Sequence, residues 1–157
     1  MATQLWLLRH GEAEPHDARA DELRRLTARG ERQSRAAGSA LAALELTFQL
    51  VATSPRVRAL DTARLACEVL GCEPVEHDAL GKGFDVEDAI ELAHAAGDDK
   101  RLLVVGHNPD FEQVLHDLTG ARLHLKKGAI AAVRLDGHRA TLLVLLRPRE
   151  IARVGRL

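Results

Sequence analysis

The chain has 157 residues, of which 46% are hydrophobic and 29% are charged, a length and composition typical of one ordinary globular domain. This balance excludes a largely disordered chain, and the formal net charge of -1 at pH 7 argues against a general nucleic-acid-binding protein. Arginine supplies 18 of the 22 basic residues, which favours bidentate contacts with defined anions. No apolar run approaches the ~20 residues that cross a bilayer, and no secretory signal is recognisable, so we expect a cytoplasmic protein without a membrane partner.

The chain begins with a short apolar run at residues 4–8, which ends at Arg9-His10-Gly11-Glu12. Such a run predicts a buried strand with two nitrogen-rich side chains at its carboxyl end. Because Gly11 lets a ligand approach the backbone closely, Arg9 and His10 could share one small anionic group. Residues 13–26, which contain Pro15, predict an exposed loop beside this strand end.

A helix is predicted over residues 28–45, with Thr27 as its N-cap. Apolar residues recur at helical spacing along this segment and just beyond it, at Ala37, Leu41, Leu44 and Phe48. The charged residues of the opposite face indicate a solvated surface.

A second apolar strand ends at Thr53, and a second helix is predicted directly after it. Ser54 is a favourable N-cap, Pro55 suits the first helical position, and Gly71 ends the helix. Arg58 falls in the first turn, where the positive end of the helix dipole favours a phosphate, whereas Arg56 is interpreted as a surface charge. The expected buried stripe of this helix consists of Leu60, Ala63, Cys67 and Leu70.

The cysteine content indicates thiols rather than a metal site. Cys67 and Cys72 lie in a helical segment, and no second cysteine pair is present to complete a zinc site. We interpret both as reduced structural cysteines.

The middle of the chain predicts one more strand and helix. Residues 74–77 form the strand, a glycine-punctuated loop covers residues 78–84, and Asp85 caps the following helix. His94 is expected on the surface of that helix. Its inward positions are Val86, Ile90 and Ala93.

Residues 101–106 predict another buried strand with the pattern of the first one. Their β-branched apolar run ends in a glycine, which His107 follows. Asn108 is the expected N-cap of the next helix and Pro109 its first residue. Further on, residues 129–135 and 139–146 flank Asp136-Gly137 and predict a β-hairpin. The remaining tail, with Arg147, Arg149, Arg153 and Arg156, indicates a solvated end.

The order of these elements predicts a three-layer α/β/α sandwich with a mostly parallel central sheet and a C-terminal antiparallel hairpin, formed by one domain over residues 1–157. The carboxyl ends of parallel strands meet at one edge, so Arg9, His10, Arg58 and His107 can converge. Such a set favours a phosphoryl-binding site. Metal ligation and a plain structural role are the alternatives for the histidines, and the surrounding arginines would repel a cation. We therefore expect neither a metal nor a cofactor.

Three separated motifs resemble those of the histidine phosphatase (phosphoglycerate mutase-like) superfamily. They are Arg9-His10-Gly11-Glu12, Ser54-Pro55-x-x-Arg58-Ala59 and Gly106-His107-Asn108-Pro109. The short chain and Arg24-x-Leu26-Thr27-x-x-Gly30 are most similar to the SixA branch, the protein phosphohistidine phosphatases. The resemblance covers nearly the whole chain, with the motifs in order.

The resemblance implies a role for each motif residue. His10 would be the nucleophile that becomes a phosphohistidine, while Arg9, Arg58 and His107 would hold the phosphoryl oxygens without a metal. Phosphate or sulfate is expected to bind in the same place. The substrate-binding set comprises Gly11, Glu12, Arg24 and Ser54, with Glu12 orienting its neighbours. Arg25 stands where the branch usually has proline, so the orientation of Arg24 is open.

The general acid has no obvious candidate. Larger members of the family carry a glutamate in a segment after the strand near His77, whereas the carboxylates of that short interval here are Asp78 and Asp85. A phosphohistidine needs little acid help, because its leaving imidazole can already be protonated, and an alkyl phosphate needs more. This favours phosphohistidine on a phosphorelay or phosphotransferase protein as the substrate. A small-molecule phosphomonoesterase and a non-catalytic phosphohistidine-binding module remain the alternatives.

Overall fold

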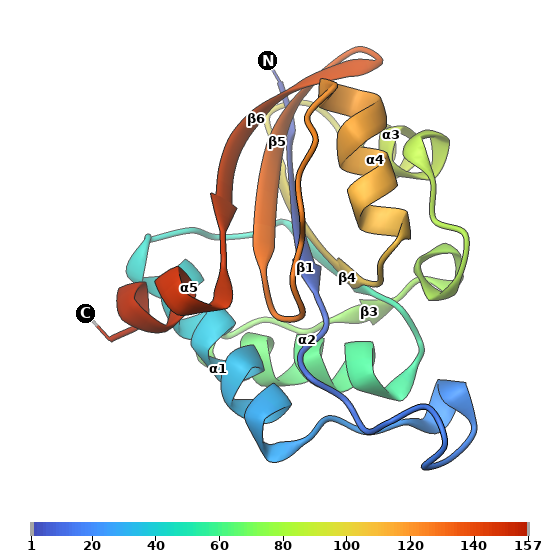
Figure 1. Cartoon of the computed structure of the whole chain (residues 1–157). Coiled ribbons are helices and arrows are strands. Elements are labelled where there is room, and N and C mark those ends of the chain that lie inside the picture. Colours follow the sequence, from blue (N-terminus) through green and yellow to red (C-terminus); the bar gives the residue numbers. More distant parts are fainter. Residues whose placement is uncertain (1, 157) are drawn as a thin grey trace.

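The computed structural model describes residues 2–156. The strands and α-helices follow one another along the chain as shown in Figure 1, with two short 3-10 helices, η1 and η2, between them. In order they are β1 (Gln4–Arg9), η1 (Asp21–Leu23), α1 (Ala28–Ala43), β2 (Leu50–Thr53), α2 (Val57–Leu70), β3 (Val75–Glu76), η2 (Asp78–Gly81), α3 (Val86–Ala96), β4 (Arg101–Gly106), α4 (Asp110–Thr119), β5 (Ile130–Asp136), β6 (Arg139–Leu146) and α5 (Pro148–Val154).

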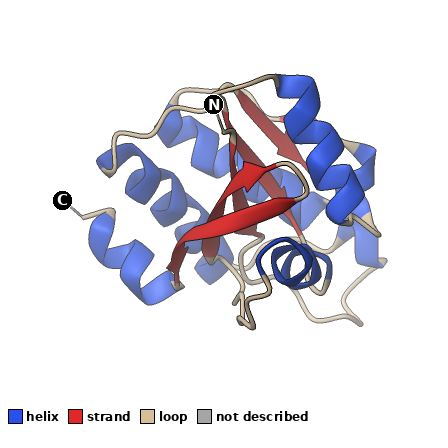
Figure 2. Cartoon of the chain, turned by 90° about the horizontal axis from the view of Figure 1, so that it is seen from above, coloured by secondary structure: helices blue, strands red, loops and turns tan. Residues whose placement is uncertain are grey.

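The strands form one six-stranded sheet in the order β3-β2-β4-β1-β5-β6. β1 to β4 run parallel to one another, while β5 pairs antiparallel with β1, and β6 antiparallel with β5. Helices cover both faces of the sheet (Figure 2). One face packs against α1, α2 and α5, and the other against α3 and α4. The predicted three-layer fold with a mostly parallel sheet and an antiparallel C-terminal hairpin is confirmed.

Helix α1 begins as predicted, because the Thr27 hydroxyl accepts a hydrogen bond from the Gly30 amide at 3.1 Å. It ends at Ala43, two residues earlier than predicted, and Glu45 then adopts a positive φ of 59°. Leu44, which continues the apolar spacing of the sequence, therefore lies beyond the helix with its side chain 45% exposed. Phe48 lies beyond the helix and packs edge-on against Trp6.

Helix α2 begins at Val57 rather than at Pro55, and Arg56 is its N-cap. The prediction failed because the Ser54 hydroxyl accepts the Arg56 amide at 3.1 Å and closes a turn that precedes the helix. The predicted end at Gly71 is confirmed, with this residue in the left-handed conformation. Near this end the free thiols of Cys67 and Cys72 lie with their sulfurs 2.9 Å apart.

Three further boundaries differ by one or two residues. β3 covers only Val75–Glu76, and α4 begins at Asp110 with Pro109 as N-cap. The Asn108 side chain does not cap the helix, because its amide donates to Glu112 and to the Leu125 carbonyl. The hairpin turn is Gly137-His138, one residue later than predicted, since Asp136 still pairs with Arg139 in the ladder.

The arginine-rich tail is not the solvated end predicted from the sequence. It forms α5, with Pro148 in its first turn, and packs against α1 with Ile151 only 1% exposed. A single buried apolar residue in a short segment gives too weak a periodic pattern to predict this helix. No helix in the described part of the chain is long and apolar enough to cross a membrane.

Candidate active site

The site lies where the carboxyl ends of three neighbouring strands meet. β4 lies between β2 and β1, and Arg9 pairs in register with Gly106, so the residues that follow β1 and β4 are adjacent. The rings of His10 and His107 lie with their centroids 5.2 Å apart. Arg58 arrives from the first turn of α2, directly after β2. The structure thus brings together Arg9, His10, Arg58 and His107.

The two ring nitrogens of His10 differ in their bonding within residues 2–156. Its Nδ1 lies 2.7 Å from the Gly11 carbonyl oxygen, which can only accept, so Nδ1 carries the proton and Nε2 keeps its electron pair. Burial is the main cause that holds the pKa of His10 well below 6.5, and the nearby positive charges of Arg58 and Arg9 contribute. The ring is therefore neutral at neutral pH.

His107 is also buried and neutral. Burial, followed by the charge of Arg58, lowers its pKa to about 3. Its Nε2 lies 2.8 Å from the Ser54 hydroxyl, which is itself fully buried. Ser54 thereby orients the His107 ring.

Three buried nitrogens of these residues have no hydrogen-bond partner among residues 2–156. They are Nε of Arg9, Nε of Arg58 and Nδ1 of His107. Each arginine is anchored through another nitrogen, since Arg9 Nη1 donates to the Leu125 carbonyl at 3.0 Å and Arg58 Nη1 to the Asp21 carbonyl at 2.7 Å. Because buried donors are normally paired, this arrangement is suited to an anion that accepts several hydrogen bonds.

Gly11 lets the loop after β1 pack tightly against the start of α1. A Cβ on Gly11 would lie 2.5 Å from the Gly30 carbonyl oxygen, and one on Gly30 only 1.9 Å from that of Glu12. The Gly11 amide donates to the Thr62 hydroxyl at 3.1 Å, and this hydroxyl donates to the Arg58 carbonyl at 2.7 Å. Thr62 thus ties the His10 loop to α2, a role that the sequence analysis missed.

Glu12 and Arg24 support the site rather than face its centre. The Glu12 carboxylate accepts from the Thr27 hydroxyl at 2.7 Å and lies 3.8 Å from Arg29. Arg24 is 6% exposed and donates through Nη1 to the Glu14 carbonyl at 2.6 Å. The loop over residues 13–26 is therefore exposed only in part.

Asp21, which the sequence analysis did not single out, connects three arginines. Its carboxylate pairs with Arg24 at 3.0 Å and with Arg58 at 3.2 Å, and also contacts Arg56. The interpretation of Arg56 as a plain surface charge is therefore wrong. Burial alone would raise the pKa of Asp21, but Arg58 and Arg24 outweigh it and hold this pKa below its usual range. In the sequence, only the spacing Asp21-x-x-Arg24, close to a predicted site, indicates that Asp21 pairs with an arginine there.

The two candidate general acids are placed differently. Asp85 is the N-cap of α3 and accepts the Asp88 amide at 2.9 Å in a capping box. Asp78 is an exposed residue at the start of η2. Neither is connected to His10 or His107 by a hydrogen bond within residues 2–156. In the same range, no group of three or more His, Cys, Asp or Glu side chains could hold a metal ion.

Comparisons with known proteins agree with this geometry. The sequence model of the Histidine phosphatase superfamily (branch 1) matches residues 5–81. An uncharacterized protein of Picosynechococcus sp. is 33% identical over 156 residues, covering 91% of this chain and 94% of its own. The chain belongs to the histidine phosphatase superfamily, which supports phosphatase activity.

Within the superfamily, the structure is SixA-like. A structure of the protein histidine phosphatase SixA complexed with tungstate is 25% identical, with a TM-score of 0.85 over 94% of this chain and 99% of that one. A candidate SixA phosphohistidine phosphatase of Agrobacterium tumefaciens is 22% identical, with a TM-score of 0.81 and the same coverage. The fold is shared with an alpha-ribazole phosphatase of Shigella flexneri (21% identical, 92% and 96% covered, TM-score 0.77) and with a phosphoserine phosphatase of Entamoeba histolytica (15% identical, 94% and 98% covered, TM-score 0.73).

Proposed function

We propose that this protein removes the phosphoryl group from protein phosphohistidine through a covalent phosphohistidine at His10. The observation that carries the proposal is the His10 ring, whose Nδ1 is bonded to the Gly11 carbonyl and whose unprotonated Nε2 makes no hydrogen bond with residues 2–156. The expected partner is a phosphohistidine-bearing component of a phosphorelay or a phosphotransferase system.

In the first step, Nε2 of His10 attacks phosphorus in line with the bond to the substrate's imidazole. A new N–P bond forms as the substrate's P–N bond breaks, and the leaving imidazole is neutral if its other nitrogen carries a proton. In the second step, water attacks the phosphoryl group on His10 and releases inorganic phosphate. His10 then returns to its neutral state with Nδ1 still bonded to Gly11.

The unpartnered nitrogens are suited to the charge that both steps develop. Nε–H of Arg9 and Nε–H of Arg58 are free to donate to phosphoryl oxygens. If the Ser54 hydroxyl donates to Nε2 of His107, the ring proton lies on Nδ1, the nitrogen left without a partner. Fixed donors of this kind need no rearrangement during the reaction.

The state of Asp21 supports phosphohistidine as the substrate. Asp21 pairs directly with Arg58, and its lowered pKa keeps it ionised at neutral pH. An ionised carboxylate cannot donate a proton to a leaving alkoxide, which an alkyl phosphate would require. A labile N-phosphate does not depend on such an acid.

Hydrolysis of a panel by the metal-free protein tests the proposal. The panel contains a phosphocarrier domain phosphorylated on histidine, free phosphohistidine, and several sugar and alkyl phosphates. We expect loss of phosphate from the carrier with little from the esters, and at least about a thousandfold slower loss with His10→Ala, because the attacking group is gone. Equal rates on esters and phosphohistidine would contradict the substrate assignment.

A small-molecule phosphomonoesterase is the second candidate, because the fold is shared with phosphatases of α-ribazole phosphate and phosphoserine. Preference for an ester in the panel would support it and would direct attention to Asp78 and Asp85 as acids. Phosphate binding without turnover of any substrate would indicate the non-catalytic phosphohistidine-binding module.

A further inference from the structure

A shallow surface hollow of about 290 Å³ lies directly beside the catalytic residues. Its lining includes four cationic side chains, Arg9, Arg29, Lys126 and Lys127, and one carboxylate, Glu12. We call the three outer cations, Arg29, Lys126 and Lys127, the basic rim. The whole chain carries a net charge of -1, so this local excess of positive charge is not a property of the protein at large.

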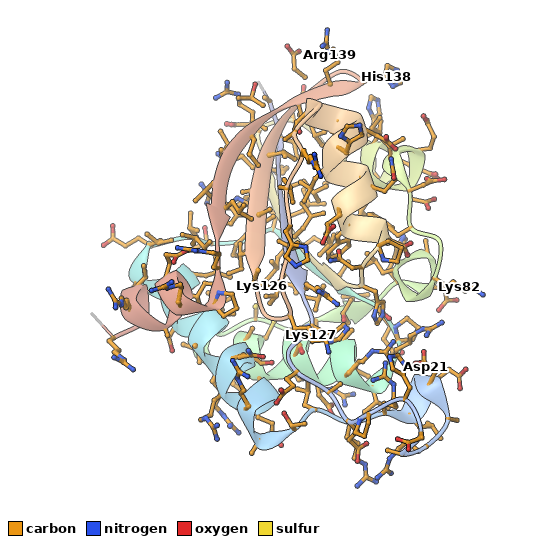
Figure 3. The ribbon with its side chains drawn as sticks, viewed as in Figure 1. Asp21, Lys82, Lys126, Lys127, His138 and Arg139 are labelled. Carbon is orange, nitrogen blue, oxygen red and sulfur yellow. The ribbon has the colours of Figure 1, made fainter. Side chains whose placement is uncertain are left out.

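The backbone of residues 125–129 fixes the basic rim to the catalytic dipeptide. The Gly128 amide lies 3.1 Å from the Arg9 carbonyl oxygen and 2.9 Å from that of His10, and donates toward both. The Ala129 amide donates to the Lys126 carbonyl at 2.9 Å and closes a turn that contains both lysines. Figure 3 shows them at the start of β5, close to the carboxyl end of β1. These hydrogen bonds therefore hold the backbone of Lys126 and Lys127 in a fixed position relative to His10.

The charges of the rim are largely uncompensated within the molecule. The side chains of Lys126 and Lys127 are exposed and make no ion pair or hydrogen bond with residues 2–156. Arg29 is 68% exposed and lies 3.8 Å from Glu12, whose carboxylate is already bonded to Thr27. The ammonium and guanidinium groups thus remain available to carboxylates of another molecule.

The shape of this surface favours a protein partner over a small anion. Each exposed ion pair contributes little in water, so a single small anion would gain little from an open rim. A protein face that presents several carboxylates engages the whole rim, and its attraction acts over ~10 Å at moderate salt. Such contacts mainly accelerate association and set the orientation of the partner.

We propose that the basic rim docks an acidic surface of the phosphoprotein substrate and orients its phosphohistidine toward His10. This inference rests on the proposed function. The acidic partner face should lie next to the phosphorylated side chain, because the rim and the nucleophile are joined through one short turn.

The double variant Lys126→Glu/Lys127→Glu tests the docking surface. The substrates are a phosphocarrier domain with acidic residues around its phosphohistidine, and free phosphohistidine. For the carrier at low salt we expect kcat/KM to fall about tenfold or more, mainly through KM, and the loss to shrink as NaCl is added. Activity on free phosphohistidine should stay within about twofold of wild type, because the backbone contacts to Arg9 and His10 remain.

The matched control is Lys100→Glu/Arg139→Glu, which changes the charge equally. Both residues are exposed, and Figure 3 places Arg139 at the tip of the β5–β6 hairpin, far from the rim. This control should retain wild-type activity on the carrier at every salt concentration. An equal loss in both double variants, no loss in either, or an equal loss on carrier and free phosphohistidine would overturn the docking proposal. If wild type hydrolyses neither phosphohistidine substrate, the proposed function itself fails, and this result is visible before any variant is compared.

Discussion

His10 and His107 are buried beside arginines, so both rings stay neutral where an exposed histidine would begin to accept a proton. The proposed mechanism requires this neutrality, because a protonated His10 would have no electron pair for phosphorus. The neutrality also has a cost in stability. The unfolded chain binds protons at these histidines below about pH 6.5, whereas the folded protein does not.

The two histidines should therefore not reduce the free energy of unfolding above about pH 6.5. Below that pH the free energy of unfolding should fall, until His107 is protonated in the folded state at a pH of about 3. Each histidine contributes a slope of at most about 1.4 kcal/mol per pH unit. We predict that His107→Asn reduces the slope measured by urea unfolding between pH 6 and 4.5 (roughly the window set by those pKa values). Identical slopes for wild type and His107→Asn would refute the assignment.

Among the carboxylates of the loop over residues 13–26, Asp21 is the one whose removal should disturb the site most. Asp21→Ala leaves the buried Arg24 and Arg58 without their carboxylate. Because Asp21 is itself partly exposed, we expect a moderate loss of about 1–2 kcal/mol in the free energy of unfolding. Asp17→Ala is the control, since Asp17 is an exposed residue of the same loop. Urea unfolding of both variants measures the effect, and equal stabilities would contradict the role given to Asp21.

At the scale of elements, the sequence predicted correctly those strands and helix ends that depend on residues close together in the chain. The apolar runs of β1, β2 and β4, the Thr27 cap of α1 and the Gly71 end of α2 depend on neighbouring residues and were predicted correctly. The start of α2 and the whole of α5 were not, since they depend on a turn at Ser54 and on contacts with α1. Tertiary contacts of this kind leave little trace in a short segment.

The packing of α5 gives a direct test at this scale. Ile151→Ala should lower the free energy of unfolding by about 2–4 kcal/mol, because it removes buried methyl groups and leaves a cavity between α5 and α1. Arg153→Ala on the exposed side of the same helix should change stability by less than about 0.5 kcal/mol. If both replacements cost equally little, α5 does not pack against α1 in solution.

At the scale of the molecule, the convergence of Arg9, His10, Arg58 and His107 was predictable because parallel strands meet at their carboxyl ends. Arg9 is the last residue of β1, His10 and His107 directly follow β1 and β4, and Arg58 lies in the first turn of the helix after β2. Asp21, Thr62 and the Lys126-Lys127 turn were not predictable, because the paths of loops decide their positions. The sequence therefore indicated the residues at the strand ends better than the residues that support them.

Binding of inorganic phosphate should couple the site to global stability. A ligand that binds only the folded state adds about 2.7 kcal/mol when its concentration is a hundred times Kd. We expect phosphate to raise Tm in wild type, and Arg58→Ala to need at least about tenfold more phosphate for the same shift. Arg64→Ala on the exposed face of α2 should respond as wild type does. An unchanged response of the Arg58 variant would show that phosphate binds elsewhere.

The most direct test of the account is to trap the phosphoryl group on the enzyme. The protein is mixed with a histidine-phosphorylated carrier labelled in its phosphoryl group, quenched under alkaline conditions within milliseconds to seconds, and mapped by mass spectrometry. The account predicts transient label on His10, absent from His10→Ala, with appearance and decay at rates that match turnover. Label on another residue, or undiminished hydrolysis by His10→Ala, would contradict it.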